Sequence, residues 1–400
     1  MMRVRDVRRW LLATVAGMVV LGPVAIADAQ ASSPPGTNGK IAFIRFDPTV
    51  DGGSRTFAID PDGTHETQIP GGAPFEFGCH GWSPQGSKLV LCTLNASGFV
   101  RPATANPDGS DFRLLDAYPN LPLNLACEWW SPDASRVICH SDDESSPATN
   151  GIYTVRSSDG GDLVRVTSEP EGLMDMPVGY SPDGSRILFL RNDPNGNWGD
   201  LFEVRPDGTG LLRLNPPGLL AASSNFDGDL GLDECCGVSA DWSPDGSQVA
   251  FSARWKASAH LGTQFALYIV NADRSDLLRI SPRGIGAGRD GVRWSPDGRL
   301  IAFSTRRQTV HYPQIYVVHP DGTGMRELTK PTNLDISVGP VWSPDSTKIL
   351  FQSFHPEING GQEDLWIINA DGTGLKQLTH PVEGLGPGEE APTWGSAPVG

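Results

Sequence analysis

Basic residues are scarce in this sequence, and long apolar runs are absent beyond its N-terminal region. The 400 residues include 31 lysines and arginines against 47 aspartates and glutamates, which gives a formal net charge of −16. A surface of this sign repels phosphate backbones, so nucleic acid is not an expected partner. No segment after Ile26 is long and apolar enough to cross a bilayer, so we expect no membrane span once the N-terminal segment is removed.

Common motifs for catalysis and metal binding are also absent. The sequence has no paired Cys or His residues at zinc-ligand spacing and no Gly-x-Ser-x-Gly nucleophile elbow. It also has no glycine-rich phosphate loop between a strand and a helix. The absence of these motifs does not exclude an enzyme whose catalytic groups come from several separate loops.

Long helical patterns are missing as well. The 47 glycines and 34 prolines break helical runs, and the apolar residues come in short bursts. We therefore expect an all-β fold.

The N-terminus has the layout of a secretory signal. A basic head with four arginines precedes an apolar stretch from Trp10 to Ile26, and small-residue cleavage sites follow at Ala27–Ala29 and Ala29–Ala31. We predict a signal peptide over residues 1–31 and a short linker over residues 32–37. Export to the periplasm or the extracellular space follows, by the general secretory or the twin-arginine route; an uncleaved anchor is the alternative.

One turn motif recurs along the rest of the chain. It consists of an aromatic residue, then Ser-Pro, then Asp or Gln, and then a small residue. The aromatic residues of six copies and of a final degenerate copy are Trp82, Trp130, Tyr180, Trp242, Trp294, Trp342 and Trp394. These residues are 48 to 62 positions apart, a period typical of four-stranded propeller blades.

A second turn, of the form Pro-Asp-Gly-Thr, follows in most of the units. Its copies begin at Asp60, Asn106, Arg205, His319 and Asn369, with looser copies near Ser158 and Asn271. Proline presets φ, Asp bonds its own backbone and Gly accepts positive φ, so both motifs predict tight turns between antiparallel strands. Each unit therefore holds four strands, A to D, with tight turns from A to B and from C to D.

The two ends of the array complete each other. The strand that begins at Lys40 reads as a B strand with no A strand before it, and Trp394 ends an A strand with no B strand after it. We predict a seven-bladed β-propeller over residues 38–395, with four-stranded antiparallel blades. The C-terminal A strand should pair with the N-terminal B, C and D strands, which leaves residues 396–400 as a tail.

Small residues recur three positions before each turn aromatic, as radial packing of innermost A strands requires. They are Cys79, Cys127, Pro177, Ser239, Gly291, Gly339 and Ala391. We interpret the turn aromatics themselves as packing between blades.

The Trp-Ser-Pro-Asp-Gly and Pro-Asp-Gly-Thr turns in alternation resemble the WD-like propeller repeat of the TolB family, over about residues 38 to 394. The resemblance implies the propeller fold. It implies no activity, because the repeat also occurs in peptidases and in secreted proteins of unknown role. TolB proteins carry an α/β domain before the propeller, and this sequence has no room for one before Lys40, so the resemblance is to the propeller alone.

The longer B-to-C and D-to-A loops share one face, where binding usually concentrates. Four histidines fall in the predicted B-to-C loops and could bind a ligand or a metal or act as acid and base: His140, His260, His311 and His355. Ordinary surface histidines are the alternative.

The longest D-to-A loop contains oxygen-bearing side chains that suit a hard cation such as calcium. They are Asn225, Asp227, Asp229, Asp233 and Glu234. The match to a calcium loop is incomplete, and an acidic solvated insertion is the alternative. No other cofactor is expected.

Six cysteines in an exported chain should be oxidised. Cys79 with Cys92, and Cys127 with Cys139, could each join strands A and B of one hairpin, whereas Cys79 with Cys127 is a rival pairing. Cys235 and Cys236 are adjacent and would form a strained ring or stay reduced.

Two functional hypotheses follow. The first is a monomeric, non-catalytic binding module that holds a protein, peptide or carbohydrate at the loop-rich face or the central mouth. The second is an extracellular hydrolase or lyase that acts on a sugar or lactone.

Overall fold

The computed structural model describes these parts of the chain: residues 35–46, 54–69, 80–141, 143, 146–170, 172–192, 198–222, 239–255, 265–282, 285, 291–305, 313–330, 336–354, 363–380 and 389–398. Within them the chain consists of β-strands and one short 3₁₀ helix, η1 (Pro147–Thr149). The all-β expectation is confirmed. No helix in the described part is long and apolar enough to span a membrane.

Five of the sheets have four antiparallel strands each; in four of them the strands pair in sequence order, and in the fifth the C-terminal strand comes before the first three. The first three contain β29 (Glu389–Ser396), β1 (Asn38–Phe46), β2 (Ser54–Ile59) and β3 (Thr67–Gln68); β4 (His80–Trp82), β5 (Leu89–Leu94), β6 (Val100–Ala105) and β7 (Arg113–Leu114); and β8 (Ala126–Trp130), β9 (Arg136–Ser141), β10 (Gly151–Arg156) and β11 (Val164–Arg165). The other two contain β21 (Val292–Trp294), β22 (Ile301–Thr305), β23 (Gln314–Val318) and β24 (Arg326–Glu327); and β25 (Ile336–Trp342), β26 (Lys348–Phe354), β27 (Glu363–Asn369) and β28 (Lys376–Gln377).

A nine-stranded sheet holds the remaining strands. It contains β12 (Met174–Tyr180), β13 (Ile187–Asn192), β14 (Trp198–Val204), β15 (Leu212–Arg213), β16 (Leu219–Ala222), β17 (Ala240–Trp242), β18 (Gln248–Trp255), β19 (Ala266–Asn271) and β20 (Leu278–Arg279). Strand β16 pairs with β14 and β18 and so joins two groups of four strands into one sheet. The described strands thus do not form seven separate sheets, and the count of seven blades stays a prediction.

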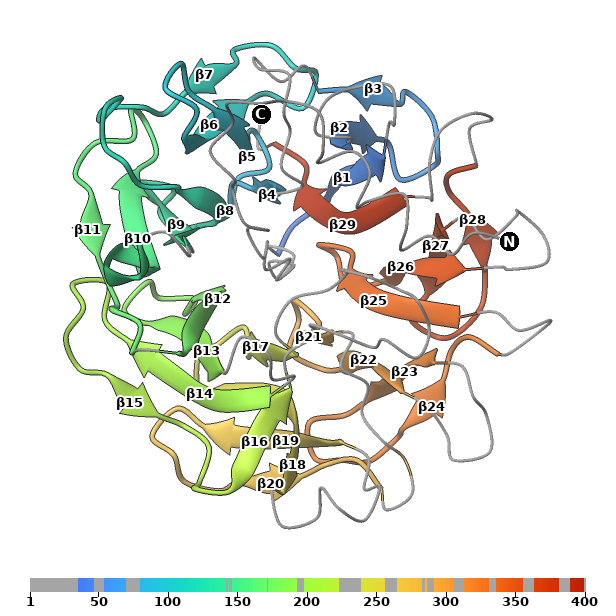
Figure 1. Cartoon of the computed structure of the whole chain (residues 1–400). Coiled ribbons are helices and arrows are strands. Elements are labelled where there is room, and N and C mark those ends of the chain that lie inside the picture. The colour runs from blue at the N-terminus through green and yellow to red at the C-terminus, as the bar shows by residue number, and fades with distance from the viewer. Residues whose placement is uncertain are drawn as a thin grey trace, which may run out of the picture.

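The sheets are arranged in a ring (Figure 1). The first strand of each unit lies nearest the centre: β29, β4, β8, β12, β17, β21 and β25. The last strand of each unit lies at the perimeter and pairs over two residues only, as in β7 and β24. The order from the centre outward is therefore A to D, as the repeat predicts.

The C-terminal strand closes the first sheet. Strand β29 pairs antiparallel with β1, with Trp394 opposite Ile41 and Thr393 opposite Ala42. Trp394 is almost fully buried and packs with Ile41 and Phe43 and with residues of β25 to β27. The predicted pairing of the two ends of the array is confirmed.

Local chemistry explains why the A-to-B turns form. In the turn that begins at Trp130, the Ser131 hydroxyl donates to Asp133 Oδ1 at 2.6 Å and accepts from the Arg136 backbone N–H at 2.9 Å. Asp133 Oδ1 also accepts from the Ser135 N–H at 3.0 Å. Similar bonds recur at Ser181 and Ser243, so the motif satisfies its own polar groups.

Neighbouring sheets meet through the turn tryptophans, as we expected. The Trp130 indole N–H donates to the Gly81 carbonyl of the preceding sheet at 3.0 Å, and Trp342 donates to Arg293 in the same way at 3.0 Å. Small residues let the inner strands approach, because a Cβ on Gly291 would lie 3.4 Å from Pro340 of the next inner strand.

Candidate functional site on the loop-rich face

The histidine candidates can be compared with the structure at His140 alone, because His260, His311 and His355 lie outside the described residues. His140 is not in a loop, as the sequence suggested: it lies in β9, opposite Ile152 of β10. The prediction placed the end of the strand too early, because pairing with β10 extends β9 to Ser141. His140 is 4% exposed and is therefore not an open rim residue.

His140 belongs to a buried charged network between two neighbouring sheets. Its Nε2 lies 3.4 Å from Oε1 of Glu169, which also accepts from the Asp175 backbone N–H at 2.9 Å. The Asp175 carboxylate is fully buried and receives two hydrogen bonds from Arg191, at 2.5 and 2.7 Å. A buried charge needs a partner, and here each member has one, so the network primarily holds β9, β12 and β13 together.

The other metal and cysteine predictions are tested only in part. Asn225, Asp227, Asp229, Asp233 and Glu234 lie outside the described residues, as do Cys79, Cys235 and Cys236. The calcium site therefore stays a prediction. The part of the chain that the structure describes contains no group of three or more His, Cys, Asp or Glu residues that could hold a metal ion.

One disulfide bond joins Cys127 of β8 to Cys139 of β9, which lie opposite each other in the ladder. This bond excludes the rival pairing of Cys127 with Cys79. Cys92 Sγ accepts a hydrogen bond from the Cys127 backbone N–H at 3.2 Å, so the two sheets also meet at this point.

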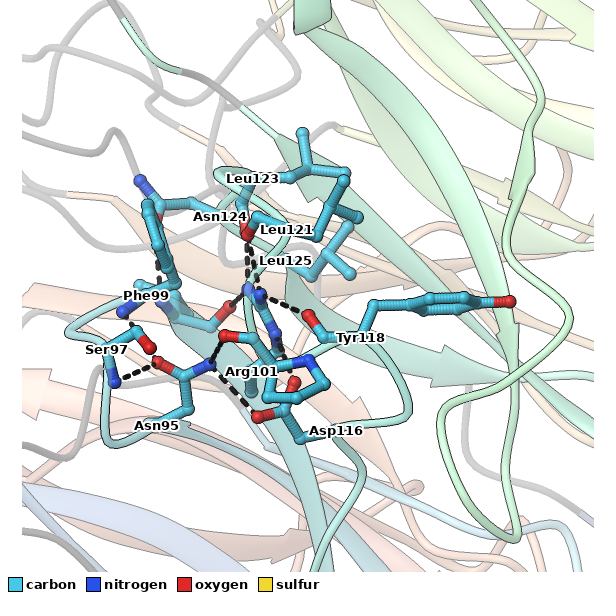
Figure 2. Close-up of polar contacts among 12 residues, drawn as sticks. Asn95, Ser97, Phe99, Arg101, Asp116, Tyr118, Leu121, Leu123, Asn124 and Leu125 are labelled. Atoms are coloured by element: carbon cyan, nitrogen blue, oxygen red, sulfur yellow. Dashed lines mark hydrogen bonds and ion pairs between the residues drawn. The ribbon is translucent and has the colours of Figure 1, made fainter.

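A second buried cluster lies in the sheet formed by β4 to β7 and was not predicted from the sequence. It centres on Arg101 of β6, which is 2% exposed (Figure 2). Arg101 Nε donates to Asp116 Oδ1 at 2.8 Å, and its terminal nitrogens donate to the backbone carbonyls of Val100, Tyr118, Leu121 and Leu123. One guanidinium thus holds the loop between β7 and β8 against β6.

Asn95 ties a second loop to the same cluster. Its Oδ1 accepts from the backbone N–H groups of Ser97 and Phe99, at 2.9 and 3.0 Å, which closes the turn between β5 and β6. Its Nδ2 donates to Asp116 Oδ2 at 3.0 Å. The two loops, residues 95–99 and 116–125, form one unit that we call the loop platform.

The loop platform presents an aromatic side chain on a fixed backbone. Tyr118 is 41% exposed, and its ring points away from the cluster in Figure 2. Its carbonyl accepts from Arg101, and Leu123 and Leu125 of the same loop are buried in the core. Such an exposed, preorganised tyrosine is typical of a binding surface.

Shifted pKa values occur among the carboxyls beside the tight turns. A hydrogen bond from the Ser131 hydroxyl lowers the pKa of Asp133, and Ser181 and Ser243 lower the pKa of Asp183 and Asp245 in the same way. Burial raises the pKa of Glu203, whose partner Arg186 is 3.3 Å away. These residues lie in or beside the tight turns.

Sequence comparison gives one weak relative. Over 61 residues the chain is 43% identical to the uncharacterized peptidase YuxL of Bacillus subtilis, a match that covers 14% of this chain and 8% of the peptidase. The chain thus spans a small fraction of the length of the curated relative it matches. No protein-family model matches the sequence.

Solved structures share the fold at low sequence identity. TolB from Acinetobacter baumannii is 18% identical, with a TM-score of 0.52 over 90% of this chain and 67% of that protein. An oligogalacturonate lyase from Vibrio parahaemolyticus is 14% identical, with a TM-score of 0.57 over 82% of this chain and 90% of the lyase. Likeness at this level concerns architecture and carries over no activity. By its fold, the chain is a TolB-like β-propeller.

Proposed function

We propose that this protein is an exported, non-catalytic binding module that holds a partner at its loop-rich face. The observation that carries the proposal is the loop platform, where the buried Arg101 fixes two loops and leaves Tyr118 exposed. A binding surface gains affinity when its loops are ordered before the partner arrives. A protein or peptide suits an exposed tyrosine on a rigid loop, and a carbohydrate at this face or the central mouth is the other ligand class.

Export is part of the proposal. The basic head and apolar stretch of residues 1–31 support a cleaved signal, and the disulfide between Cys127 and Cys139 suits an oxidising compartment such as the periplasm or the extracellular space. The acidic net charge supports a monomeric protein that avoids nucleic acid.

An extracellular hydrolase or lyase acting on a sugar or lactone is the second candidate. It is favoured by the proximity of His140 and Glu169 and by the similarity in fold to the oligogalacturonate lyase. It is disfavoured by the burial of both side chains, since an acid and a base must reach the substrate.

The binding proposal is tested by a change at Tyr118. Purified mature protein, immobilised, is used to capture partners from the envelope and secreted fractions of the source cells, and the affinity of a captured protein is then measured in isolation. Because truncation of a central aromatic anchor often removes most of an interface's energy, Tyr118→Ala should weaken binding about thirtyfold. Leu375→Ala is the matched control, because Leu375 is 55% exposed and lies beside the outer strand β28.

Equal capture by the wild type and Tyr118→Ala would contradict the role of the loop platform. Turnover of a sugar or lactone by the wild type, lost in His140→Gln with unchanged melting temperature, would instead favour the enzyme.

A further inference from the structure

A cleft opens between the second and third sheets on the opposite, tight-turn face. It has a volume of about 260 Å³ and lies between β4–β7 and β8–β11. Most of the lining residues are polar and include Gln85, Lys88, Asp111, Arg113 and Ser158, together with one aromatic residue, Trp130. The cleft lies on the other face of the ring from the loop platform, so any ligand here is independent of the partner proposed above.

Trp130 differs from the other turn tryptophans. Trp82, Trp242, Trp294, Trp342 and Trp394 are all at most 6% exposed. Trp130 is partly exposed, although its indole N–H makes the same bond to the preceding sheet that Trp342 makes. Among the other turn aromatics only Tyr180 of the next copy is also half-buried, so the wall of the cleft presents part of an indole ring that the five other tryptophans bury.

Gln85 is a second departure from the repeat at the same place. Five of the other turn copies have an aspartate at this position, whereas the final copy, after Trp394, has Ala397. Asp133, Asp183 and Asp245 each accept a hydrogen bond from the serine two residues before. Gln85 carries no charge, and its side chain is exposed at the cleft. The turn that borders the cleft therefore lacks the negative charge that five of the other turns carry.

The charge of the cleft also differs from that of the whole protein. Lys88 Nζ lies 2.5 Å from Asp111 Oδ2, and Arg113 Nη2 lies 3.9 Å from Asp111 Oδ1. Two cations thus share one carboxylate in a chain whose net charge is −16. Arg113 is 58% exposed, which leaves its planar group accessible to a ligand.

We propose that this cleft binds a short saccharide that carries a carboxylate. The indole face of Trp130 would take the apolar face of a pyranose ring, and hydroxyl and amide groups such as those of Ser158 and Gln85 would bond its hydroxyls. Arg113 and Lys88 would hold the carboxylate, since a guanidinium matches that group in two hydrogen bonds. The small volume suits one or two sugar rings better than a long chain.

Ligand-observed NMR titrations with glucuronate, glucose, acetate and the peptide Gly-Gly-Glu test the proposal. A ligand of this size with a few good contacts should bind with a Kd of about 1 mM. We expect glucuronate to bind saturably, glucose to bind about tenfold more weakly and acetate not to saturate. Raising the salt concentration should weaken glucuronate binding, because the charges are exposed.

Two variants locate the site. Arg113→Gln should reduce glucuronate affinity about tenfold, through the loss of a charge-assisted hydrogen bond. Gln85→Asp restores the residue that other turns use and adds a repelling charge, so it should weaken binding without unfolding the turn. The control is Arg326→Gln, since Arg326 begins the outer strand β24 as Arg113 begins β7 and likewise donates to a carbonyl of the next sheet.

Three results would overturn the proposal: equal binding of glucose and glucuronate, tighter binding of Gly-Gly-Glu than of glucuronate, or an equal effect of Arg113→Gln and Arg326→Gln. None of them bears on the partner of the loop platform. Failure of the Tyr118→Ala test would likewise leave the cleft untouched.

Discussion

Two arginines with little exposure, Arg101 and Arg191, hold together the loops and strand ends of the loop-rich face. Arg191 pairs in two hydrogen bonds with Asp175 and lies over the rings of Phe189 and Phe202. Arg101 instead distributes its donors over one carboxylate and four backbone carbonyls. A guanidinium can do both because it offers five N–H donors in one plane. Lysine could not replace it in either place.

Removal of Arg101 should therefore be costly. Arg101→Met leaves the Asp116 carboxylate and several carbonyls without their partner, so we expect the free energy of unfolding to fall by about 3 kcal/mol. Arg326→Met removes one bond from an exposed arginine and should cost no more than about 0.5 kcal/mol. Urea titrations of both variants and the wild type measure the difference. Equal values for the two variants would show that the loop platform is held by its leucines instead.

The role of Arg101 could not be predicted from the sequence. Its partners are mostly carbonyl oxygens, which every residue type carries, and they lie on an irregular loop up to 22 positions away. The exposure of Trp130 could not be predicted either, because the same Trp-Ser-Pro-Asp sequence begins the turns of the buried Trp242, Trp294 and Trp342. The irregular B-to-C turn, with the sequence Asn-Ala-Ser-Gly at residues 95–98, gave no signal for the role of Asn95 either.

At the scale of the element, the hairpins are where sequence and structure agree best. Proline, aspartate and glycine act within five or six residues, so the turns and the strands beside them could be predicted from local chemistry. Strand ends depend on partners in the neighbouring strand, which explains why His140 was assigned to a loop. The outer strands β11 and β15 are two residues long.

The turn aspartates make stability depend on pH. Serine hydroxyls lower the pKa of Asp133, Asp183 and Asp245 below the ordinary 3.8, so these carboxyls bind protons more weakly in the folded state than in the unfolded one. The contribution of these carboxyls to the free energy of unfolding is complete above their pKa in the unfolded chain. It is lost as the pH falls through their lower pKa in the folded protein. Acid titration below about pH 4, followed by circular dichroism, should show unfolding.

The triple variant Asp133→Asn, Asp183→Asn and Asp245→Asn isolates this effect. Asparagine keeps an acceptor for the serine but does not titrate, so stability should fall less steeply with acid than in the wild type. An unchanged slope would assign the acid sensitivity to carboxyls other than these three.

For the whole molecule, closure of the first sheet depends on a strand from the far end of the chain. Trp394 inserts into the core beside Ile41, and its indole N–H donates to the Gly39 carbonyl at 3.1 Å. The sequence was sufficient to predict this pairing, because each end of the array lacks the strand that the other supplies. The join through β16 was not predictable, since it arises from a segment outside the repeat pattern.

Trp394→Ala should accordingly destabilise the whole ring. Loss of a fully buried tryptophan costs about 3 to 5 kcal/mol, and loosening β29 exposes the edge of β1 to other chains. Trp255→Ala is the control, since Trp255 is 43% exposed and should cost far less. Calorimetry gives the melting temperatures, and light scattering detects the expected aggregation of Trp394→Ala alone.

The pairing of β1 with β29 also delays closure of the first sheet until the end of translation. The two strands meet across 355 residues of chain, which a ribosome makes in roughly 20 to 70 s. During that interval the nascent β1 has been synthesised and its partner has not. A newly made chain must therefore shield this strand, through a chaperone or through transient contacts with β2, until translation delivers β29.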